Sequence, residues 1–402
     1  MKIGIISNLY PPFVRGGAEI IASTLAEGLK DNLHHVFVIS TQPPSGWSSW
    51  WPRARETRGV KVYRFYPWNL YYYLNDYAYP AIIRLVWHLL DIFNLHSYLA
   101  VRSVIAKEKP DMVITHNLMG IGFLIPYLLR RHGIIHIHTV HDVQLYNPSG
   151  IIIRGQENNW QQRLVNLLGY PRLMRRLLGS PKMVISPSQF LLNFYQQRGF
   201  FPRTECLQVV RNPVDFPDRA LTRSTAAELR LAYVGQITEA KGILQLVDLV
   251  HRLQRTDVRL RVVGLGPKLN QALELAGQDE RIQFYGWRSR QDLLEILTHT
   301  DILVMPSTCY ENSPTVTLEA LSLGIPVISS DIGGAAELIK PDFNGWIFEA
   351  GNWRQLDLLI NKLADSRGNI GAMTTACQQS VAGFTVKNYL QRLLDCINLP
   401  AK

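Results

Sequence analysis

The chain has few cysteines and no long apolar run. Its 402 residues include only four cysteines, Cys206, Cys309, Cys377 and Cys396, and no two of them form a Cys-x-x-Cys pair. This spacing argues against a zinc ribbon or a disulfide framework and predicts reduced thiols in a cytoplasmic protein. Because no stretch of about 18 apolar residues occurs, no transmembrane helix is expected. The apolar run at Met1–Ser7 is too short for a signal peptide.

Acidic residues are scarce in the first half of the chain. Overall the composition is 47% hydrophobic and 18% charged, which is typical of a globular protein and excludes a largely disordered one. Residues 1–212 hold 23 basic and 11 acidic residues, a net charge of +12, whereas residues 213–402 hold 19 and 21, a net charge of −2. This asymmetry predicts an anionic partner for the first half: a membrane surface, a nucleic acid or a phosphorylated substrate.

Short apolar runs alternate with helical spacing in two series. The first series predicts strands at Lys2–Ser7, Val36–Ser40, Asp111–Thr115 and Ile134–Val140, with a helix at Ala18–Lys30. The second predicts strands at Leu229–Val234, Arg259–Val263, Arg281–Tyr285, Ile302–Met305 and Pro326–Ser330, with helices at Ile243–Gln254 and Gln291–Leu297. This pattern predicts two doubly wound α/β domains, 1–212 and 213–382, with a boundary near Arg211–Pro217. The amphipathic tail Val386–Leu399 could pack on either domain.

Ligands of open α/β sheets bind at the carboxyl ends of the strands, so the residues after each strand are candidates. Gly16 and Gly17 follow the first strand and open a helix. Glycine lets a backbone approach a ligand, and a helix N-terminus favours an anion. A flexible turn is the alternative.

Polar pairs follow two further strands of the first half. His141 and Asp142 come directly after the strand Ile134–Val140, and His116 and Asn117 occupy the same place one strand earlier. Their position predicts site residues. A buried histidine satisfied by its neighbours is the alternative.

A metal site is not predicted. His136, His138 and His141 form a His-x-His-x-x-His string, but strand alternation places His141 on the opposite face from the other two. The sequence also contains no Asp-x-Asp motif that would hold a metal on a diphosphate. No cofactor is expected.

In the second half, Lys241 lies just before a predicted helix, where a lysine beside helix-end amides can hold a phosphate. A solvated surface lysine is the alternative. Gly264 and Gly266 follow the next strand and predict a close-approach turn.

The densest segment runs from residue 306 to residue 321. Ser313 is predicted to be a helix N-cap and Pro314 the first helical residue. Glu311 then lies in the loop and Glu319 about a turn and a half into the helix. Carboxylates at these places can accept hydrogen bonds from sugar hydroxyls while the amides face a phosphate. A capped helix with a solvated glutamate is the alternative.

Together these segments resemble the retaining nucleotide-sugar glycosyltransferases of family four, and the resemblance spans nearly the whole chain. Its most specific part is Glu311, seven intervening residues and Glu319, followed by Gly-Ile-Pro-Val-Ile and Asp-Ile-Gly-Gly. The other motifs are Gly-Gly-Ala-Glu (16–19), Lys-Pro-Asp (109–111), Thr-Val-His-Asp (139–142), Arg-Asn-Pro-Val-Asp (211–215) and Glu-Ala-Lys-Gly (239–242). The resemblance implies the GT-B fold: two Rossmann-like domains facing across a cleft, with the C-terminal helix, about 383–402, packed back on the first.

The resemblance also implies residue roles. His141 and Glu311 would contact the donor sugar and Lys241 the diphosphate, and these three are the catalytic candidates. The implied donor site further includes Gly16 and Gly17 near the phosphates, Gly264 and Gly266 beside the base, Ser313, Pro314 and Thr315 around the diphosphate, and Glu319 at the ribose. The candidates on the acceptor side, in the first domain, are Asn8, His116, Asn117 and Asp142.

One departure concerns Gln236, which stands where the family usually has an arginine next to the diphosphate. An amide does not replace a bidentate guanidinium, so the leaving group would lose a neutralising charge unless Arg211 or another basic residue supplies it. This departure leaves open a slow enzyme or a non-catalytic nucleotide-sugar-binding protein. An epimerase or hydrolase with the same fold is a separate alternative to a transferase.

The implied reaction transfers a hexose from a UDP- or GDP-sugar with retention of configuration. Two segments rich in basic and aromatic residues, Trp47–Tyr73 and Trp160–Lys182, predict peripheral contact with an anionic membrane at its cytoplasmic face. That contact fits a lipid-linked acceptor in polysaccharide or glycolipid assembly. No nucleic-acid-binding motif is present, and no nucleic-acid partner is expected.

Overall fold

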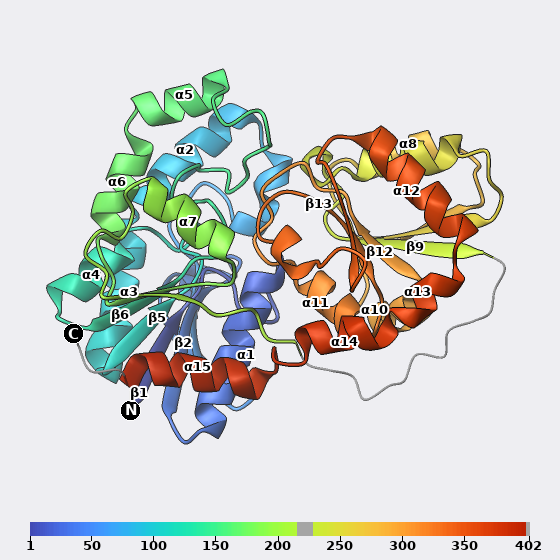
Figure 1. Cartoon of the computed structure of the whole chain (residues 1–402). Helices are drawn as coiled ribbons and strands as arrows, with labels where there is room; N and C mark the ends of the chain where they lie inside the picture. Colours follow the sequence, from blue (N-terminus) through green and yellow to red (C-terminus); the bar gives the residue numbers. More distant parts are fainter. Residues whose placement is uncertain (215–227, 399–402) are drawn as a thin grey trace. The chain divides into compact units, whose positions relative to one another are not determined.

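The computed structural model describes residues 1–214 and 228–398, which fall into two compact units (Figure 1). Unit 1 comprises Met1–Ile151, Asn158–Pro213 and the C-terminal segment from Val386, and unit 2 comprises Ile152–Glu157 and the described part of Val214–Thr385. Residues 215–217 of the predicted boundary and residues 399–402 of the predicted C-terminal helix lie outside the described residues.

Unit 1 contains an eight-stranded sheet of order β3-β4-β2-β1-β5-β6-β7-β8, parallel except for the antiparallel pair β3–β4. Its strands are β1 (Lys2–Ile6), β2 (His35–Thr41), β3 (Arg53–Thr57), β4 (Val60–Phe65), β5 (Met112–Thr115), β6 (Ile135–Thr139), β7 (Met183–Ser186) and β8 (Cys206–Val209). The four predicted strands are confirmed. The other four, β3, β4, β7 and β8, were missed, and β3 is largely exposed and carries no apolar run.

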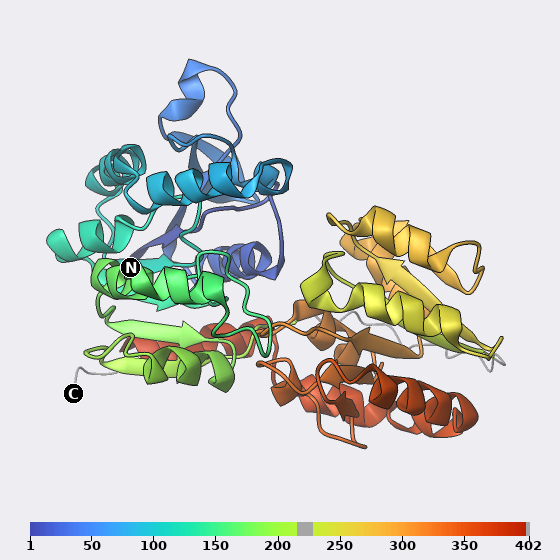
Figure 2. The same cartoon turned by 90° about the horizontal axis from the view of Figure 1, so that it is seen from above.

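The helices of unit 1 flank this sheet (Figure 2). They are α1 (Gly17–Asp31), η1 (Trp47–Trp50), η2 (Tyr73–Ala78), α2 (Ala81–Ile92), α3 (Leu95–Glu108), α4 (Ile125–Arg131), α5 (Trp160–Leu167), α6 (Tyr170–Leu178), α7 (Gln189–Gln197) and α15 (Val386–Asn398). The C-terminal helix α15 packs on α1 in one core, through Tyr389, Leu390 and Leu393. A Cβ at Gly28 would lie 2.3 Å from Leu390 Cδ1, so the glycine permits this close approach.

Unit 2 contains a parallel six-stranded sheet of order β11-β10-β9-β12-β13-β14. Its strands are β9 (Leu229–Val234), β10 (Val258–Val263), β11 (Ile282–Gly286), β12 (Ile302–Met305), β13 (Val327–Ser330) and β14 (Gly345–Phe348). Its helices are η3 (Glu239–Lys241), α8 (Ile243–Arg252), α9 (Leu269–Ala276), α10 (Arg290–Thr298), α11 (Thr315–Ser322), η4 (Ala336–Leu338), α12 (Trp353–Asp365), α13 (Gly368–Ala372) and α14 (Thr374–Val381). All five predicted strands are confirmed.

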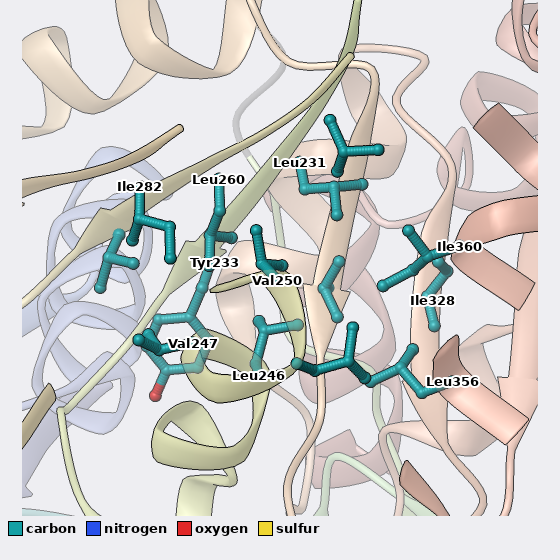
Figure 3. Close-up of a cluster of buried hydrophobic side chains, with 14 of the residues drawn as sticks. Leu231, Tyr233, Leu246, Val247, Val250, Leu260, Ile282, Ile328, Leu356 and Ile360 are labelled. Atoms are coloured by element: carbon teal, nitrogen blue, oxygen red, sulfur yellow. The ribbon is translucent and has the colours of Figure 1, made fainter. Parts of the chain in front are cut away.

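Apolar residues hold this sheet between its helices. On one face, Leu231 and Leu260 of the sheet join Leu246 and Val250 of α8 in a single buried cluster, to which α12 adds Ile360 (Figure 3). Burying each leucine contributes on the order of 2 kcal/mol. The sheet is therefore a rigid base for the loops at its carboxyl edge.

The predicted start of α11 is wrong by one residue. Pro314 has φ −61° and ψ 123°, an extended conformation, so it occupies the N-cap position and the helix begins at Thr315. Ser313 therefore precedes the cap. Within the ranges described, none of the helices is long and apolar enough to span a bilayer.

Candidate functional site

Glycine residues allow the loops that follow β9 and β10 to approach each other closely. A Cβ on Gly264, which has φ +142°, would lie 1.8 Å from the carbonyl oxygen of Gly235. A Cβ on Gly266 would lie 2.3 Å from the oxygen of Ile237. The turn that the sequence predicted at these glycines is thus a tight contact between two loops at the carboxyl edge of the sheet.

Lys241 and Glu311 meet at this edge. Lys241 ends η3 directly before α8, and its Nζ forms an ion pair with Glu311 Oε1. Ser307 Oγ donates to the same carboxylate oxygen at 2.7 Å. The side chains of Lys241 and Glu311 remain 25% and 13% exposed, so solvent can reach both. The structure therefore brings together two residues that lie 70 positions apart and that the sequence singled out separately.

The backbone of Glu311 is also fixed. Gly334 N donates to Glu311 O at 2.7 Å, and a Cβ at Gly333 would lie 2.2 Å from that oxygen. On the other side, Thr308 N donates to Ala240 O at 2.9 Å. The loop after β12 is therefore held by both neighbouring loops, which sets the position of the carboxylate.

A short segment from the first half of the sequence joins this loop. We call residues Ile152–Glu157 the strap, because they belong to unit 2 although the chain on both sides belongs to unit 1. Ile153 forms an antiparallel bridge with Cys309, and Tyr310 N donates to Ile152 O at 3.0 Å. The strap thus adds backbone pairing to the loop that carries Glu311.

Side chains reinforce the strap. Tyr310 Oη donates to Glu157 Oε1 at 2.7 Å, and Arg154 forms an ion pair with Asp331. The Tyr310 hydroxyl is the strongest side-chain cause that holds the pKa of Glu157 below its usual value. The strap was not predicted from the sequence, because no local pattern marks a segment whose partners lie about 150 residues away.

Gln236 and Glu319 complete the donor-side candidates in unit 2. The buried Tyr233 hydroxyl donates to Gln236 O at 2.7 Å, which fixes the backbone there. Glu319 lies in the second turn of α11, and burial raises its pKa. In unit 1, Arg211 Nη1 donates to Pro187 O at 3.0 Å, so at least part of that guanidinium is engaged.

In unit 1, His116 and His141 form a pair. His116 Nδ1 lies 2.8 Å from His141 Nε2, and the two rings are stacked. Burial lowers the pKa of His141 to about 4 and that of His116 well below its usual value. Both rings are therefore neutral near pH 7, and one N–H donates to the other ring.

The other two histidines of the His-x-His-x-x-His string, His136 and His138, share a different partner. His136 Nε2 and His138 Nδ1 lie 2.7 and 2.8 Å from Thr115 Oγ1. His141 instead contacts His116, so it has a different hydrogen-bond partner from these two. His136 and His138 are buried histidines that share the Thr115 hydroxyl.

Asn8, Asn117 and Asp142 hold the loops around the histidine pair. Asn8 is 1% exposed, and its Nδ2 donates to Met119 O at 2.8 Å. Gln144, which was not predicted from the sequence, donates from Nε2 to Asn117 Oδ1 and from its backbone to Asp142 Oδ1, both at 2.8 Å. Burial raises the pKa of Asp142 to about 6. Asn8 therefore connects the loop after β1 to the loop after β5, while Gln144 connects Asn117 to Asp142.

Gly16 and Gly17 open α1 as predicted. Gly16 N donates to Glu19 Oε2 at 2.8 Å, and burial raises the pKa of this carboxyl. The neighbouring Arg15 stacks on the Tyr73 ring at 4.7 Å. One amide at this helix start is thus already used by the helix's own glutamate, and Arg15 adds a positive charge beside it.

Two family models match the chain. "Glycosyltransferase Family 4" matches residues 15–216 and "Glycosyl transferases group 1" matches residues 219–377. An uncharacterized 42.6 kDa protein of the cps region of Klebsiella pneumoniae is 26% identical over 85% of this chain and 88% of its own length. The lipopolysaccharide 1,6-galactosyltransferase of Escherichia coli is 29% identical over 46% of this chain and 54% of its own.

Solved structures share the fold. Sucrose-phosphate synthase from Thermosynechococcus elongatus has a TM-score of 0.76 at 17% identity and covers 98% of both chains. Alr3699/HepE from Anabaena, in complex with UDP-glucose, has a TM-score of 0.71 at 18% identity and covers 99% of both. The two parallel sheets, the loops at their carboxyl edges and the family matches agree, and the chain belongs to the group 1, family 4 glycosyltransferases with the two-domain, Rossmann-like GT-B fold.

Proposed function

We propose that the protein is a retaining hexosyltransferase that moves a sugar from a UDP- or GDP-sugar to a lipid-linked acceptor in polysaccharide or glycolipid assembly. The observation that carries this proposal is the pair of Lys241 and Glu311, held at the carboxyl edge of the unit 2 sheet. The names of two relatives support a polysaccharide or glycolipid product, since one relative belongs to a cps region and the other is a lipopolysaccharide galactosyltransferase. The UDP-glucose complex of the Anabaena protein supports a nucleotide-sugar donor.

The chemistry follows from the charges. Departure of a nucleoside diphosphate needs positive charge at the leaving group, which Lys241 and backbone amides supply. Glu311 accepts hydrogen bonds from hydroxyls of the transferred sugar, and a neutral His141 can donate to or accept from the same sugar. In a same-face attack, the departing phosphate takes the acceptor proton, so no protein nucleophile is assigned.

Donor binding tests the proposal. Thermal shift of the purified protein against UDP, GDP, ADP and their sugars should identify one nucleotide class, because a ligand of the folded state raises apparent stability. Lys241→Ala should weaken that binding about tenfold or more, while Lys362→Ala, an exposed lysine on α12, should leave it unchanged. Equal binding by wild type and Lys241→Ala would contradict the assigned site.

A non-catalytic nucleotide-sugar-binding protein is the second candidate, and Gln236 is the observation that favours it. Binding of a donor without release of nucleotide, with or without lipid-linked acceptors, would support that candidate. Nucleotide release or sugar epimerisation without any acceptor would instead support a hydrolase or an epimerase.

A further inference from the structure

Helix α2 carries an exposed apolar face. Six side chains along and just after the helix are between 42% and 67% exposed: Ile82, Leu85, Val86, Leu89, Leu90 and Phe93. Their spacing of one, three and four residues places them on one broad helical stripe. A monomeric protein in water rarely exposes so large a contiguous apolar surface, so this stripe marks an interaction site.

The opposite face of α2 is firmly anchored. Trp87 is 2% exposed, its Nε1 donates to Tyr71 O at 2.9 Å, and its ring stacks on Tyr71 and Tyr73. Near the end of the helix, Asp91 Oδ2 accepts from Gly120 N at 2.8 Å. These contacts fix the rotation of α2 about its own axis, and the apolar stripe on its other face is therefore exposed.

Exposed tryptophans extend the stripe beyond α2. Leu95 is 68% exposed, and the next residue, His96, contacts the rings of Trp51 and Trp68, which are 57% and 59% exposed. Trp47, 82% exposed, joins them through Trp50. Tryptophan prefers the boundary between the headgroups and the acyl chains of a bilayer.

A second helix adds apolar and basic groups. Trp160, Leu164 and Leu167 of α5 and the following Leu168 are between 45% and 82% exposed. Residues 158–204 contain no Asp or Glu but include the exposed Arg163, Arg172, Arg176 and Lys182. Both α2 and α5 lie at the upper end of unit 1 in Figure 1, the end that Figure 2 views from above.

We propose that α2, the exposed tryptophans and α5 form a membrane-binding face that lies in the headgroup region of an anionic bilayer. Apolar residues flanked by basic ones, on a unit with net charge +12 over residues 1–212, match a surface that is apolar inside and negative outside.

The membrane-binding face is joined to the acceptor-side residues. Gly120, whose amide bonds Asp91 of α2, belongs to the loop that begins with His116 and Asn117 after β5. Binding of α2 to a bilayer would therefore hold this loop close to the headgroups, where a lipid-linked acceptor presents its polar end. This link to the acceptor rests on the proposed function, whereas the membrane contact does not.

Flotation with lipid vesicles tests the proposal. Wild type should float with vesicles of phosphatidylcholine containing about 30% phosphatidylglycerol at low salt, and at least about tenfold more weakly with phosphatidylcholine alone. The double variant Leu85→Glu/Leu89→Glu should lose about tenfold or more of the binding, since both charges would enter the apolar layer. The matched control Leu358→Glu, 61% exposed on α12 of unit 2, should bind like wild type.

The proposal is overturned if wild type does not float at low salt, if the double variant floats like wild type, or if neutral vesicles bind equally well. If wild type forms a dimer in solution and the double variant does not, the face binds a second copy of the chain instead.

Measuring nucleotide binding without vesicles separates the membrane-binding proposal from the proposed transferase function. If the double variant no longer floats but keeps the thermal stability and the UDP or GDP binding of wild type, the loss is confined to the membrane-binding face. If wild type floats but binds no nucleotide, only the proposed donor site is contradicted.

Discussion

His116 Nδ1 lies 2.8 Å from His141 Nε2, although the two residues are 25 positions apart. They follow β5 and β6, which are parallel neighbours, so the carboxyl ends of the strands bring the two rings together. His116 is fully buried, whereas His141 is partly exposed. His116 is therefore a positioning residue that sets the ring orientation of His141, and we propose that the sugar contact implied by the family resemblance falls to His141.

The buried histidines make stability depend on pH. Burial lowers the pKa of His136 to about 3, from an ordinary value of 6.5. Between these two values the unfolded chain binds a proton that the folded chain does not, so the contribution of His136 to stability is present above pH 6.5 and is lost as pH falls. His136→Gln should remove this loss: below pH 6 the variant should gain about 1.4 kcal/mol per pH unit relative to wild type.

Urea unfolding at several pH values between 7 and 5 measures this difference. The exposed His132→Gln serves as the control and should follow the wild-type profile. Parallel curves for wild type and His136→Gln would show that His136 is protonated equally in both states.

Glu311→Gln should separate binding from turnover. The amide keeps the shape of the side chain but removes the charge beside Lys241, and a sugar hydroxyl loses a charged acceptor. We expect kcat to fall about 100-fold while the Kd for the nucleotide alone changes less than about threefold. Glu274→Gln, an exposed glutamate on α9, is the control. A loss confined to nucleotide affinity would place Glu311 at the diphosphate instead.

The sequence predicted the sheet centres and most of the candidate residues, but not how they meet. β12 and, after its first residue, β1 are continuous apolar runs buried on both faces, and such runs are visible in the sequence. The exposed β3 lacks this signal. The strap and the pair of His116 and His141 depend on contacts between distant segments, which local periodicity does not encode. Gln144 was missed for the same reason.

Gly264 should tolerate no side chain. Its φ of +142° and a Cβ position 1.8 Å from Gly235 O combine backbone strain with a clash against backbone. Gly264→Ala should lower the free energy of unfolding by about 3 kcal/mol or more. Gly277→Ala is the matched control: it also has positive φ, 56°, but no atom lies within 4 Å of the added Cβ, so only about 1 kcal/mol should be lost. Similar losses in urea unfolding of the two variants would contradict the packing of these loops.

The hydroxyl of Tyr310 should hold the strap against the loop. Tyr310→Phe removes its hydrogen bond to Glu157 and should cost about 1 kcal/mol of local stability. Trypsin should then cut after the exposed Arg154 about fivefold faster, because cleavage requires local opening of the strap. Tyr285→Phe, on a hydroxyl that bonds Gln283 in β11, is the control. Unchanged cleavage would mean that the backbone pairing and the ion pair of Arg154 with Asp331 hold the strap without this hydroxyl.

Gln236→Arg should strengthen binding of the nucleoside diphosphate. Gln236 follows β9 in the loop that also carries Lys241, and its backbone is fixed by Tyr233, so a guanidinium placed there can reach the same edge of the sheet. A second cation beside the diphosphate should lower the Kd about tenfold and raise kcat, because the charge of the leaving group grows during transfer. Gln278→Arg adds the same charge at an exposed position after α9 and should leave Kd and kcat unchanged.

If Gln236→Arg raises affinity but shows no turnover, the missing arginine is not the reason for a lack of turnover, and the non-catalytic alternative gains support. If it changes neither affinity nor turnover while Lys241→Ala still abolishes binding, this chain neutralises the diphosphate through groups other than the one at position 236.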